Sequence, residues 1–220
     1  MESDQTVARL REIGTSTLSD ALDRLGLPGA VPGVLPFDTG LRLCGRAFTG
    51  QYEPVDENGG TVGDYIDDVA PGEIVVLNNH GRLDCTVWGD ILTYVSSARG
   101  IGGTVIDGVC RDVGPSLELR YPVFTRGRTM QTGKDRVRLA HTGRPVLLGQ
   151  VEVVPGDFVV GDADGVVVLA AAEAERVLAV AVEIDEAEDR IRRAVAAGSR
   201  LDEARAEAGY HVLQTRGGAR

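Results

Sequence analysis

The middle of the chain alternates between short apolar runs typical of buried strands and amphipathic stretches typical of helices. Residues 73–77 and 102–107 are apolar runs bounded by turn residues, and residues 88–100 between them carry apolar side chains at helical spacing. Later, residues 157–161 and 166–169 flank a short Asp/Gly turn and predict a hairpin. This mixture predicts an α/β fold with a mixed central sheet rather than a purely doubly wound one.

Helical periodicity also marks both ends of the chain. Residues 6–25 carry apolar side chains at helical spacing, with a break near Gly14 after which Ser16 or Thr17 would cap a second helix. Alanine, glutamate and arginine dominate two C-terminal stretches, which predict helices over residues 171–197 and 199–208. The intervening segments predict a loop at 26–36, a strand at 41–49, a polar turn-rich stretch at 52–63, a short helix at 65–69 and a turn at 78–81. No linker or repeat interrupts the chain, which predicts one domain over residues 1–220.

Composition excludes several classes of function. The formal net charge of −10 argues against nucleic acid as a partner, because a phosphate backbone requires a basic surface. No apolar run approaches the ~20 residues of a membrane helix, and the acidic N-terminus lacks the features of a signal peptide. The three cysteines are widely spaced and form no CxxC pair, which argues against a disulfide framework or a cysteine-rich zinc site. We therefore expect a cytoplasmic protein with no nucleic-acid and no membrane partner.

Glycine is about twice as frequent as usual, with 29 residues, which indicates many tight turns or close backbone approaches. These glycines form no GxGxxG after a predicted strand, and no Walker lysine motif occurs, so the sequence argues against nucleotide binding.

Two carboxylates and one guanidinium are predicted to meet at one edge of the sheet. Asp90 stands where a helix begins, and Arg111 and Asp112 come just after the buried strand at 102–107. Ligands collect at the carboxyl ends of strands in α/β sheets. Since one helix separates the two elements, the strand is expected to return Arg111 and Asp112 to a place beside Asp90.

The start of this helix is predicted to bind an anion. The first-turn amides of Ile91 and Leu92 are expected to point outward at the positive end of the helix dipole. Paired carboxylates hold Mg²⁺ or Mn²⁺ largely through water, and Arg111 would stabilise the charge that forms on the oxygen of a chelated 2-oxo acid. Simpler interpretations stay open, with Asp90 as a helix N-cap and Arg111 and Asp112 as a surface ion pair.

Asp90, followed after twenty residues by Arg111 and Asp112, resembles the D-x20-R-D signature of a known family. These are the class II 4-hydroxy-4-methyl-2-oxoglutarate / 4-carboxy-4-hydroxy-2-oxoadipate aldolases, which share a fold with the regulator of ribonuclease E activity A and were often labelled demethylmenaquinone methyltransferases. The resemblance covers nearly the whole chain and includes residues 17–22, 45–49, 70–76, 106–112, 122–124, 154–157 and 162–167.

The resemblance implies a swivelling β/β/α domain that assembles as a homotrimer or homohexamer, with its site at a subunit interface. It implies that Asp112 binds the divalent metal directly and that Asp90 orients metal-bound water. Arg111 would contact the keto oxygen of the substrate and the water that acts as base. The pyruvate carboxylate would be held by the amides of Gly89, Asp90, Ile91 and Leu92.

A glutamate from the C-terminal helix of a neighbouring subunit also contacts metal-bound water in this family. Glu188, ten residues before Gly198, is the best match in this chain, and a solvated helix face is an equally good interpretation of it.

The implied activity is that of a class II, metal-dependent lyase. It would cleave 4-hydroxy-2-oxo acids to pyruvate by a retro-aldol reaction, or decarboxylate oxaloacetate, because both reactions pass through a metal-bound pyruvate enolate. The presence of Asp90, Arg111 and Asp112 together favours catalysis. Two alternatives are a non-catalytic regulator that binds a ribonuclease and a family member repurposed for another substrate in specialised metabolism.

Two segments depart from the family pattern. Residues 78–84 are more polar than expected, so that His80 and Arg82 could recognise a second carboxylate, although a hydrogen bond of His80 within its own turn is the favoured interpretation. Residues 129–134 lack an expected proline. The substrate is therefore the weakest inference from the resemblance.

Other conspicuous residues predict structure rather than chemistry. Cys110 is expected to be a buried cysteine at a strand end, and Trp88 a packing anchor for the helix at the site. Asp162 and Asp164 resemble part of a calcium loop, but a turn between two strands explains them more simply. The histidines show no HxH or HExxH spacing, which argues against a zinc site.

Overall fold

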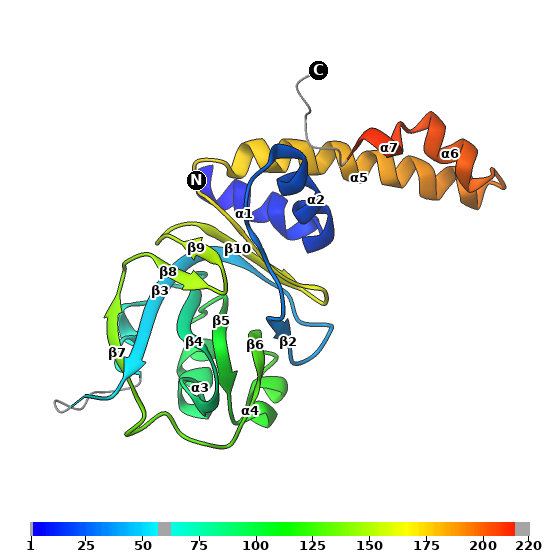
Figure 1. The fold of residues 1–220 in the computed structure, drawn as a ribbon. Helices are drawn as coiled ribbons and strands as arrows, with labels where there is room; N and C mark the ends of the chain where they lie inside the picture. Colours follow the sequence, from blue (N-terminus) through cyan, green and yellow to red (C-terminus); the bar gives the residue numbers. More distant parts are fainter. Residues whose placement is uncertain (1, 57–62, 214–220) are drawn as a thin grey trace. The chain divides into compact units, whose positions relative to one another are not determined.

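The computed structural model describes residues 2–56 and 63–213. The chain divides into two compact units, one formed by the segments up to Gly29 and from Ala172 onward, the other continuous from Ala30 to Ala171. Figure 1 shows the first as helices and the second as a sheet flanked by short helices. Two packing units can belong to one domain, so a single domain over residues 1–220 stays a prediction.

The helical unit joins both ends of the chain. Its helices are α1 (Glu2–Glu12), α2 (Thr15–Leu25), α5 (Ala174–Ala196), α6 (Leu201–Glu207) and α7 (Tyr210–Leu213). The C-terminal helices are thus confirmed. In the described part of the chain, no helix combines the length and the apolar character needed to cross a bilayer.

The break between α1 and α2 is confirmed, but its predicted cap is wrong. Gly14 is the N-cap of α2 in an extended conformation, and no side chain caps this helix. Ser16 and Thr17 lie inside the first turn, and Thr17 is buried instead of facing the helix end. Threonine is a favourable N-cap residue, but the side chain of Thr17 is buried and so does not cap the helix.

The helices of this unit pack through one buried face of α5. Val177, Leu178, Ala181 and Ile184 lie on that face at helical spacing, and α1 and α2 pack against α5. In the first turn of α5, the Glu175 carboxylate accepts a hydrogen bond of 2.6 Å from the Thr6 hydroxyl.

The second unit is built on a mixed sheet. Among the described residues, nine strands form this sheet, and its core β3–β4–β5–β6 is parallel whereas the outer pairs are antiparallel. The main path runs through β1 (Ala30–Val31), β11 (Gly165–Leu169), β10 (Phe158–Asp162), β3 (Leu43–Pro54), β4 (Ile74–Thr86), β5 (Gly103–Cys110), β6 (Val123–Arg128) and β2 (Leu35–Pro36). The ninth strand, β7 (Val137–Thr142), pairs with β3, and β8 (Val146–Leu148) forms a separate ribbon with β9 (Val151–Val153). The predicted α/β fold with a mixed central sheet is confirmed.

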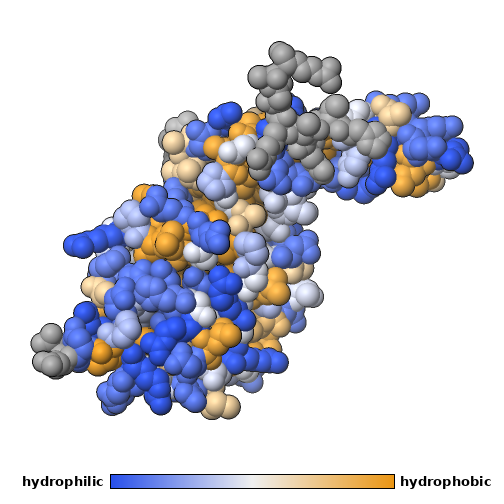
Figure 2. Space-filling model, viewed as in Figure 1, coloured by the Kyte–Doolittle hydropathy of each residue, from blue (hydrophilic) through white to orange (hydrophobic). Residues whose placement is uncertain are grey.

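Each face of the parallel strands packs into its own apolar core. One core contains Val76, Val105 and Phe124 together with residues of β8 and β9. The other contains Leu77 and Ile106, and it lies under the helical side of the unit, formed by η1 (Ile66–Asp68), α3 (Asp90–Ala98) and α4 (Val113–Glu118). Figure 2 shows hydrophilic residues over most of the visible surface, with apolar residues in smaller groups. Because α3 and α4 cover the same face, their N-termini can meet at one sheet edge.

The predicted turn at residues 78–81 is wrong. These residues lie inside β4, where the pairing with β5 shifts register between Asn78 and Arg82. His80 and Gly81 have positive φ angles of 53° and 65°, so the turn-forming residues are absorbed in a bulge and the strand continues.

Other boundaries differ less. The predicted loop at 26–36 contains the two-residue strands β1 and β2, and β3 runs to Pro54, into the predicted turn-rich stretch at 52–63. The rest of that prediction falls partly on residues 57–62, outside the described residues. The hairpin β10–β11 is confirmed, and its turn is closed by the Asp164 N–H, which donates to Asp162 Oδ1 at 3.0 Å, as expected of a turn.

Candidate functional site

The predicted site residues stand at the ends of two neighbouring elements. Asp90 is the first residue of α3, and Gly89 before it is the N-cap. Arg111 and Asp112 follow the last residue of β5, and Asp112 is the N-cap of α4 in the left-handed conformation, with φ of 58°. Few residues other than glycine and asparagine adopt that conformation readily, and Asp is among the tolerated ones.

The expected meeting of these residues is observed. The backbone N–H of Asp90 donates to Asp112 Oδ2 at 3.2 Å, and Arg111 Nε lies 3.2 Å from the same oxygen. The Arg111 N–H donates to the Trp88 carbonyl at 3.2 Å, which ties the segment after β5 to the segment before α3. The strand therefore returns Arg111 and Asp112 beside Asp90.

Gly89 permits this approach because it has no side chain. A Cβ at this position would lie 2.7 Å from Asp112 Oδ2 and 3.3 Å from Arg111 Nε. The backbone of Gly89 is extended and available to any residue, so space rather than conformation requires glycine here.

The amides of the helix start are not free as expected. The Ile91 N–H donates to Asp90 Oδ1 at 2.9 Å, and the Asp90 N–H is engaged by Asp112. The prediction that the Ile91 amide points outward without a partner is thus wrong in this structure, because the short Asp90 side chain folds back on the helix end. Carboxylate oxygens already occupy two positions where a substrate carboxylate is expected to bind.

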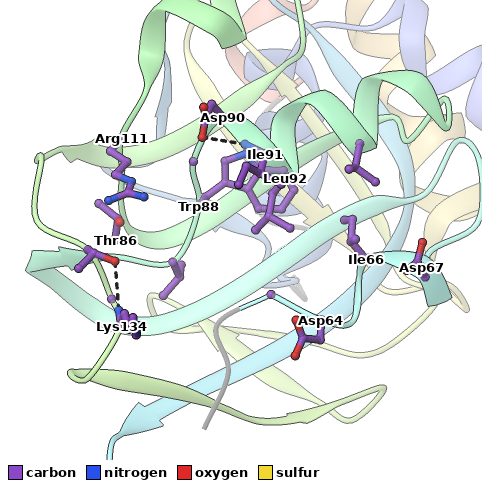
Figure 3. Close-up of a pocket in the computed structure, with 16 residues that line it drawn as sticks. Asp64, Ile66, Asp67, Thr86, Trp88, Asp90, Ile91, Leu92, Arg111 and Lys134 are labelled. Atoms are coloured by element: carbon purple, nitrogen blue, oxygen red, sulfur yellow. Dashed lines mark hydrogen bonds between the residues drawn. The ribbon is translucent and has the colours of Figure 1, made fainter.

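A pocket of about 660 Å³ opens beside these residues. Figure 3 shows Asp90, Ile91 and Leu92 of α3 on one side, and Ile66 and Asp67 of η1 on another. The wall also contains Gly89 and Arg111 and the apolar side chains of Val87, Trp88, Leu92 and Val95.

Sequence reasoning missed several residues of this pocket, namely Asp64, Asp67, Thr86, Thr132 and Lys134. They come from segments distant in sequence that no local motif connects. The one signal in the sequence was the glycine at position 133, because glycine allows a close approach between backbones. A Cβ at this position would lie 2.2 Å from the Thr86 carbonyl oxygen.

Trp88 holds the site helix in place, as predicted. Its indole N–H donates to Thr93 Oγ1 at 2.9 Å, and that hydroxyl lies 3.2 Å from Ser116 Oγ on α4. The indole also stacks on Tyr121, with ring centroids 6.1 Å apart. The buried polar chain links α3 to α4 and so fixes the distance between their N-termini.

Cys110 is a structural residue, as expected. Burial, together with the charge of the neighbouring Asp112, raises the pKa of its thiol to about 12, so the nucleophilic thiolate is suppressed. The Cys110 Sγ–H donates to the Arg111 carbonyl at 3.0 Å. Cys44, Cys85 and Cys110 are all buried, and the structure pairs none of them in a disulfide.

The oxygen donors at this site fit a hydrated hard cation. In residues 2–56 and 63–213, no group of three or more His, Cys, Asp and Glu side chains is arranged to hold a metal ion. Asp90 and Asp112 supply carboxylates only, and among the described contacts Asp112 Oδ1 has no hydrogen-bond partner. Two carboxylates suit Mg²⁺ or Mn²⁺, which keep several water ligands, and do not suit Zn²⁺, which prefers nitrogen and sulfur.

The remaining predicted residues lie elsewhere. Glu188 is on α5 in the helical unit, where it pairs with Arg192 at 3.4 Å as on a solvated helix face, and its role toward a neighbouring subunit stays a prediction. His80 Nε2 lies 3.0 Å from Gln51 Nε2 and 3.2 Å from Glu53 Oε1, so its ring bonds to β3 and the favoured bond within its own turn is wrong for the ring. Arg82 pairs with Asp84 at 2.7 Å.

Comparison with known proteins identifies the family. Residues 15–168 match the family model described as RraA-like, Aldolase/RraA. The chain belongs to the Aldolase/RraA family.

Its relatives in this family carry different names. The protein DlpA of Legionella pneumophila is 36% identical over 96% of this chain, which spans only 35% of the DlpA length. A Halalkalibacterium halodurans protein with the provisional name 4-hydroxy-4-methyl-2-oxoglutarate aldolase is 33% identical over 78% of this chain and 80% of its own length. The crystal structure of Streptomyces coelicolor RraAS2, described as an unusual member of the RNase ES inhibitor RraA protein family, superposes with a TM-score of 0.79 at 28% identity, covering 86% of this chain and 96% of RraAS2.

Proposed function

We propose that this family member is a divalent-metal-dependent C–C lyase. It cleaves 4-hydroxy-2-oxo acids to pyruvate, decarboxylates oxaloacetate, or does both. One observation carries the proposal, namely that Asp112 Oδ2 lies 3.2 Å from both the Asp90 amide and Arg111 Nε, and that Asp90 and Arg111 line a pocket. Helix-capping and a surface ion pair explain either contact alone, but they do not explain why both meet at a cavity.

Each of the three charged side chains at this site has a separate proposed role. Asp112 would hold Mg²⁺ or Mn²⁺ through Oδ1, and Asp90 would hold a water ligand of the cation. When bound, the cation supplies Lewis-acid polarisation of the keto oxygen of the substrate. Arg111 uses Nε to orient Asp112, so its terminal N–H groups remain for the oxygen on which charge develops.

Both reactions use the same group of residues. In the retro-aldol reaction a base removes the proton of the 4-hydroxyl, and the C3–C4 bond breaks as the C4 carbonyl forms. The electron pair passes to C3 and the keto oxygen, which gives the pyruvate enolate. In oxaloacetate the same bond breaks with release of CO₂, and in both cases C3 then takes a proton. Arg111 stabilises the enolate oxygen in either case.

The test is pyruvate release from 4-hydroxy-4-methyl-2-oxoglutarate and from oxaloacetate, with Mg²⁺ and with a chelator. Arg111→Ala is expected to reduce turnover at least a hundredfold, in line with the loss of a donor aimed at a developing oxyanion, roughly 10²–10³. Asp112→Asn is expected to reduce turnover as strongly, because it removes the charge of the proposed metal ligand. Turnover of both substrates that survives the chelator, or either substitution, would remove this mechanism.

A second candidate function is inhibition of a ribonuclease without catalysis. It is favoured by the structural likeness to RraAS2, which is described as a member of a family of RNase ES inhibitors. Capture of ribonuclease E by the purified chain, together with no turnover of any 2-oxo acid, would support it. If the purified wild-type chain turns over a 2-oxo acid and does not capture ribonuclease E, this candidate function is rejected.

The proposal extends to assembly as a homotrimer or homohexamer, with Glu188 of one copy near the site of another. Support comes from the exposed apolar side chains of Ile91 and Tyr94 on α3, with exposed fractions of 74% and 68%, next to the pocket. Light scattering of the purified protein measures the assembly, and a monomer would contradict this part.

A further inference from the structure

The helices α3 and α4 lie on one face of the sheet and contact each other at two levels (Figure 1). At their N-terminal ends, the Asp90 N–H donates to Asp112 Oδ2 at 3.2 Å. A second contact joins Thr93 Oγ1 of α3 to Ser116 Oγ of α4, also at 3.2 Å. Thr93 follows Asp90 by three residues and Ser116 follows Asp112 by four, so the second contact lies about one helical turn farther from the candidate site. The relative position of the two helix ends therefore depends on both contacts.

The two contacts lie in different surroundings. The side chain of Asp112 is partly exposed to solvent, whereas Thr93 and Ser116 are fully buried. Water can replace a lost hydrogen bond at the surface, so the contact of the Asp112 carboxylate with the Asp90 N–H holds the helices together only weakly. A buried hydroxyl that loses its partner stays unpaired, which makes the deeper contact costly to break. The buried pair therefore does more than the exposed one to set the spacing of α3 and α4.

Trp88 connects the buried pair to the backbone of the site. An indole N–H can only donate, so Thr93 Oγ1 accepts the 2.9 Å bond from Trp88 Nε1 and keeps its own proton available for the contact with Ser116. The Trp88 carbonyl accepts a bond from the Arg111 N–H at 3.2 Å, and the indole stacks on Tyr121. The Tyr121 N–H in turn donates to the Ser116 carbonyl at 3.0 Å. A displacement of either hydroxyl is therefore transmitted to the segment that carries Arg111.

The Asp112 carboxylate has two partners to serve at this site. It accepts the Asp90 N–H in the structure, and a carboxylate that turns toward a cation can lose this bond. We propose that Thr93 and Ser116 are positioning residues that keep Asp112 beside the start of α3 when its carboxylate engages a divalent cation. This inference rests on the proposed function, because the cation is part of it. Neither Thr93 nor Ser116 lines the pocket, so both act on the affinity for the cation through Asp112.

The affinity for Mn²⁺ measures this role without any turnover. Free Mn²⁺ is followed by electron paramagnetic resonance as the full chain is titrated, and Asp112→Asn identifies the binding that belongs to this site by its loss. Ser116→Ala is expected to weaken Mn²⁺ binding about tenfold, the lower end of the effect of changing residues that orient metal ligands. Thr93→Val tests the same contact from α3 and is expected to weaken binding at least as much, because it also leaves the Trp88 indole N–H unpaired. Thr93→Ser keeps the hydroxyl and is expected to stay within about twofold of wild type.

Thr104→Val is the matched control for a loss of stability. Thr104 Oγ1 and the Tyr121 hydroxyl form another buried pair, 2.9 Å apart, but Thr104 belongs to β5 and does not join α3 to α4. This variant is expected to lower Tm about as much as Ser116→Ala and to leave Mn²⁺ binding unchanged. In the double variant Thr93→Val/Ser116→Ala, the loss of affinity is expected to equal that of Thr93→Val alone, because both substitutions remove one shared contact.

Mn²⁺ affinity that is unchanged in Ser116→Ala and Thr93→Val, or that falls equally in Thr104→Val, overturns the positioning role. The proposed function fails separately. If metal-dependent pyruvate release is found and these variants bind Mn²⁺ like wild type, only the role of Thr93 and Ser116 is wrong. If they bind Mn²⁺ more weakly and no 2-oxo acid is turned over, the lyase activity is wrong and the positioning role stands. Wild-type protein that shows no saturable Mn²⁺ binding contradicts both.

Discussion

Gly89→Ala tests whether the position of the Asp112 carboxylate matters for activity. The new Cβ would lie 2.7 Å from Asp112 Oδ2, and ordinary van der Waals contact begins at 3.4 Å, so this oxygen must move by 3.4 − 2.7 = 0.7 Å. The atom that moves is the end of a side chain, and the extended backbone of residue 89 accepts alanine. The substitution therefore displaces a proposed metal ligand without straining the fold.

The size of the effect follows from that displacement. Misplacement of a reacting group by about 1 Å costs up to roughly 10²-fold in rate, so a shift of 0.7 Å is expected to lower kcat/KM by about 10- to 100-fold. This loss corresponds to about 1.4–2.7 kcal/mol of transition-state stabilisation. Alanine is a poorer N-cap than glycine, which adds up to about 1 kcal/mol of destabilisation and lowers Tm by roughly 2–4 °C.

The assay is pyruvate release with Mg²⁺, measured alongside thermal unfolding of each variant. Gly114→Ala is the matched control, because a Cβ at this position in α4 would meet nothing within 4 Å. It is expected to keep wild-type activity. Activity of Gly89→Ala within twofold of wild type would show that the Asp112 carboxylate need not stay where the structure places it. A fall in Tm well beyond the control would assign the loss to unfolding instead.

Three further predictions address the metal, the thiol and the fold. Mn²⁺ is expected to quench the fluorescence of Trp88, the one tryptophan of the chain, because its side chain lines the pocket, and Asp112→Asn should abolish saturable quenching. Burial raises the pKa of Cys110 to about 12 from about 8.5 in an unfolded chain, so the folded state holds the thiol proton more tightly. This contribution to stability is complete below pH ~8.5 and is lost as the pH rises toward 12, which chemical denaturation of wild type and Cys110→Ser at pH 7 and 10 would detect as a smaller pH-dependent loss in the variant. Asp107→Asn is expected to destabilise the protein by about 3 kcal/mol and to lower Tm by roughly 6–12 °C, because the buried Asp107 carboxylate pairs with Arg126; an unchanged Tm would contradict this.

The part of the site formed by the start of α3 and the end of β5 could be predicted from the sequence, because short local patterns determine both. Gly89 followed by Asp90 is typical of a helix start, and the apolar strand before Arg111 and Asp112 has to return to the same sheet edge. Both inferences need only the strand–helix–strand order of the chain, which leaves few topologies.

Other features depend on contacts that no local pattern encodes. The polar residues from Asn78 to Gly81 have the composition of a turn, but neighbouring strands hold them in a bulge of β4. Local chemistry cannot distinguish a chain reversal from a bulge, because both use positive φ angles. The wall with Thr132 and Lys134 was missed for the same reason, since its place depends on the bridge to Thr86.

The division of the chain has a consequence for its synthesis on the ribosome. α1 and α2 pack against α5, and the Thr6–Glu175 hydrogen bond joins residues separated by 169 positions. The 171 − 29 = 142 residues of the sheet unit are made between these partners. At 5–20 residues per second, the apolar faces of α1 and α2 wait roughly 7–28 s for the helix that covers them. The sheet unit is complete before then, so during translation α1 and α2 are the segments that most need a chaperone.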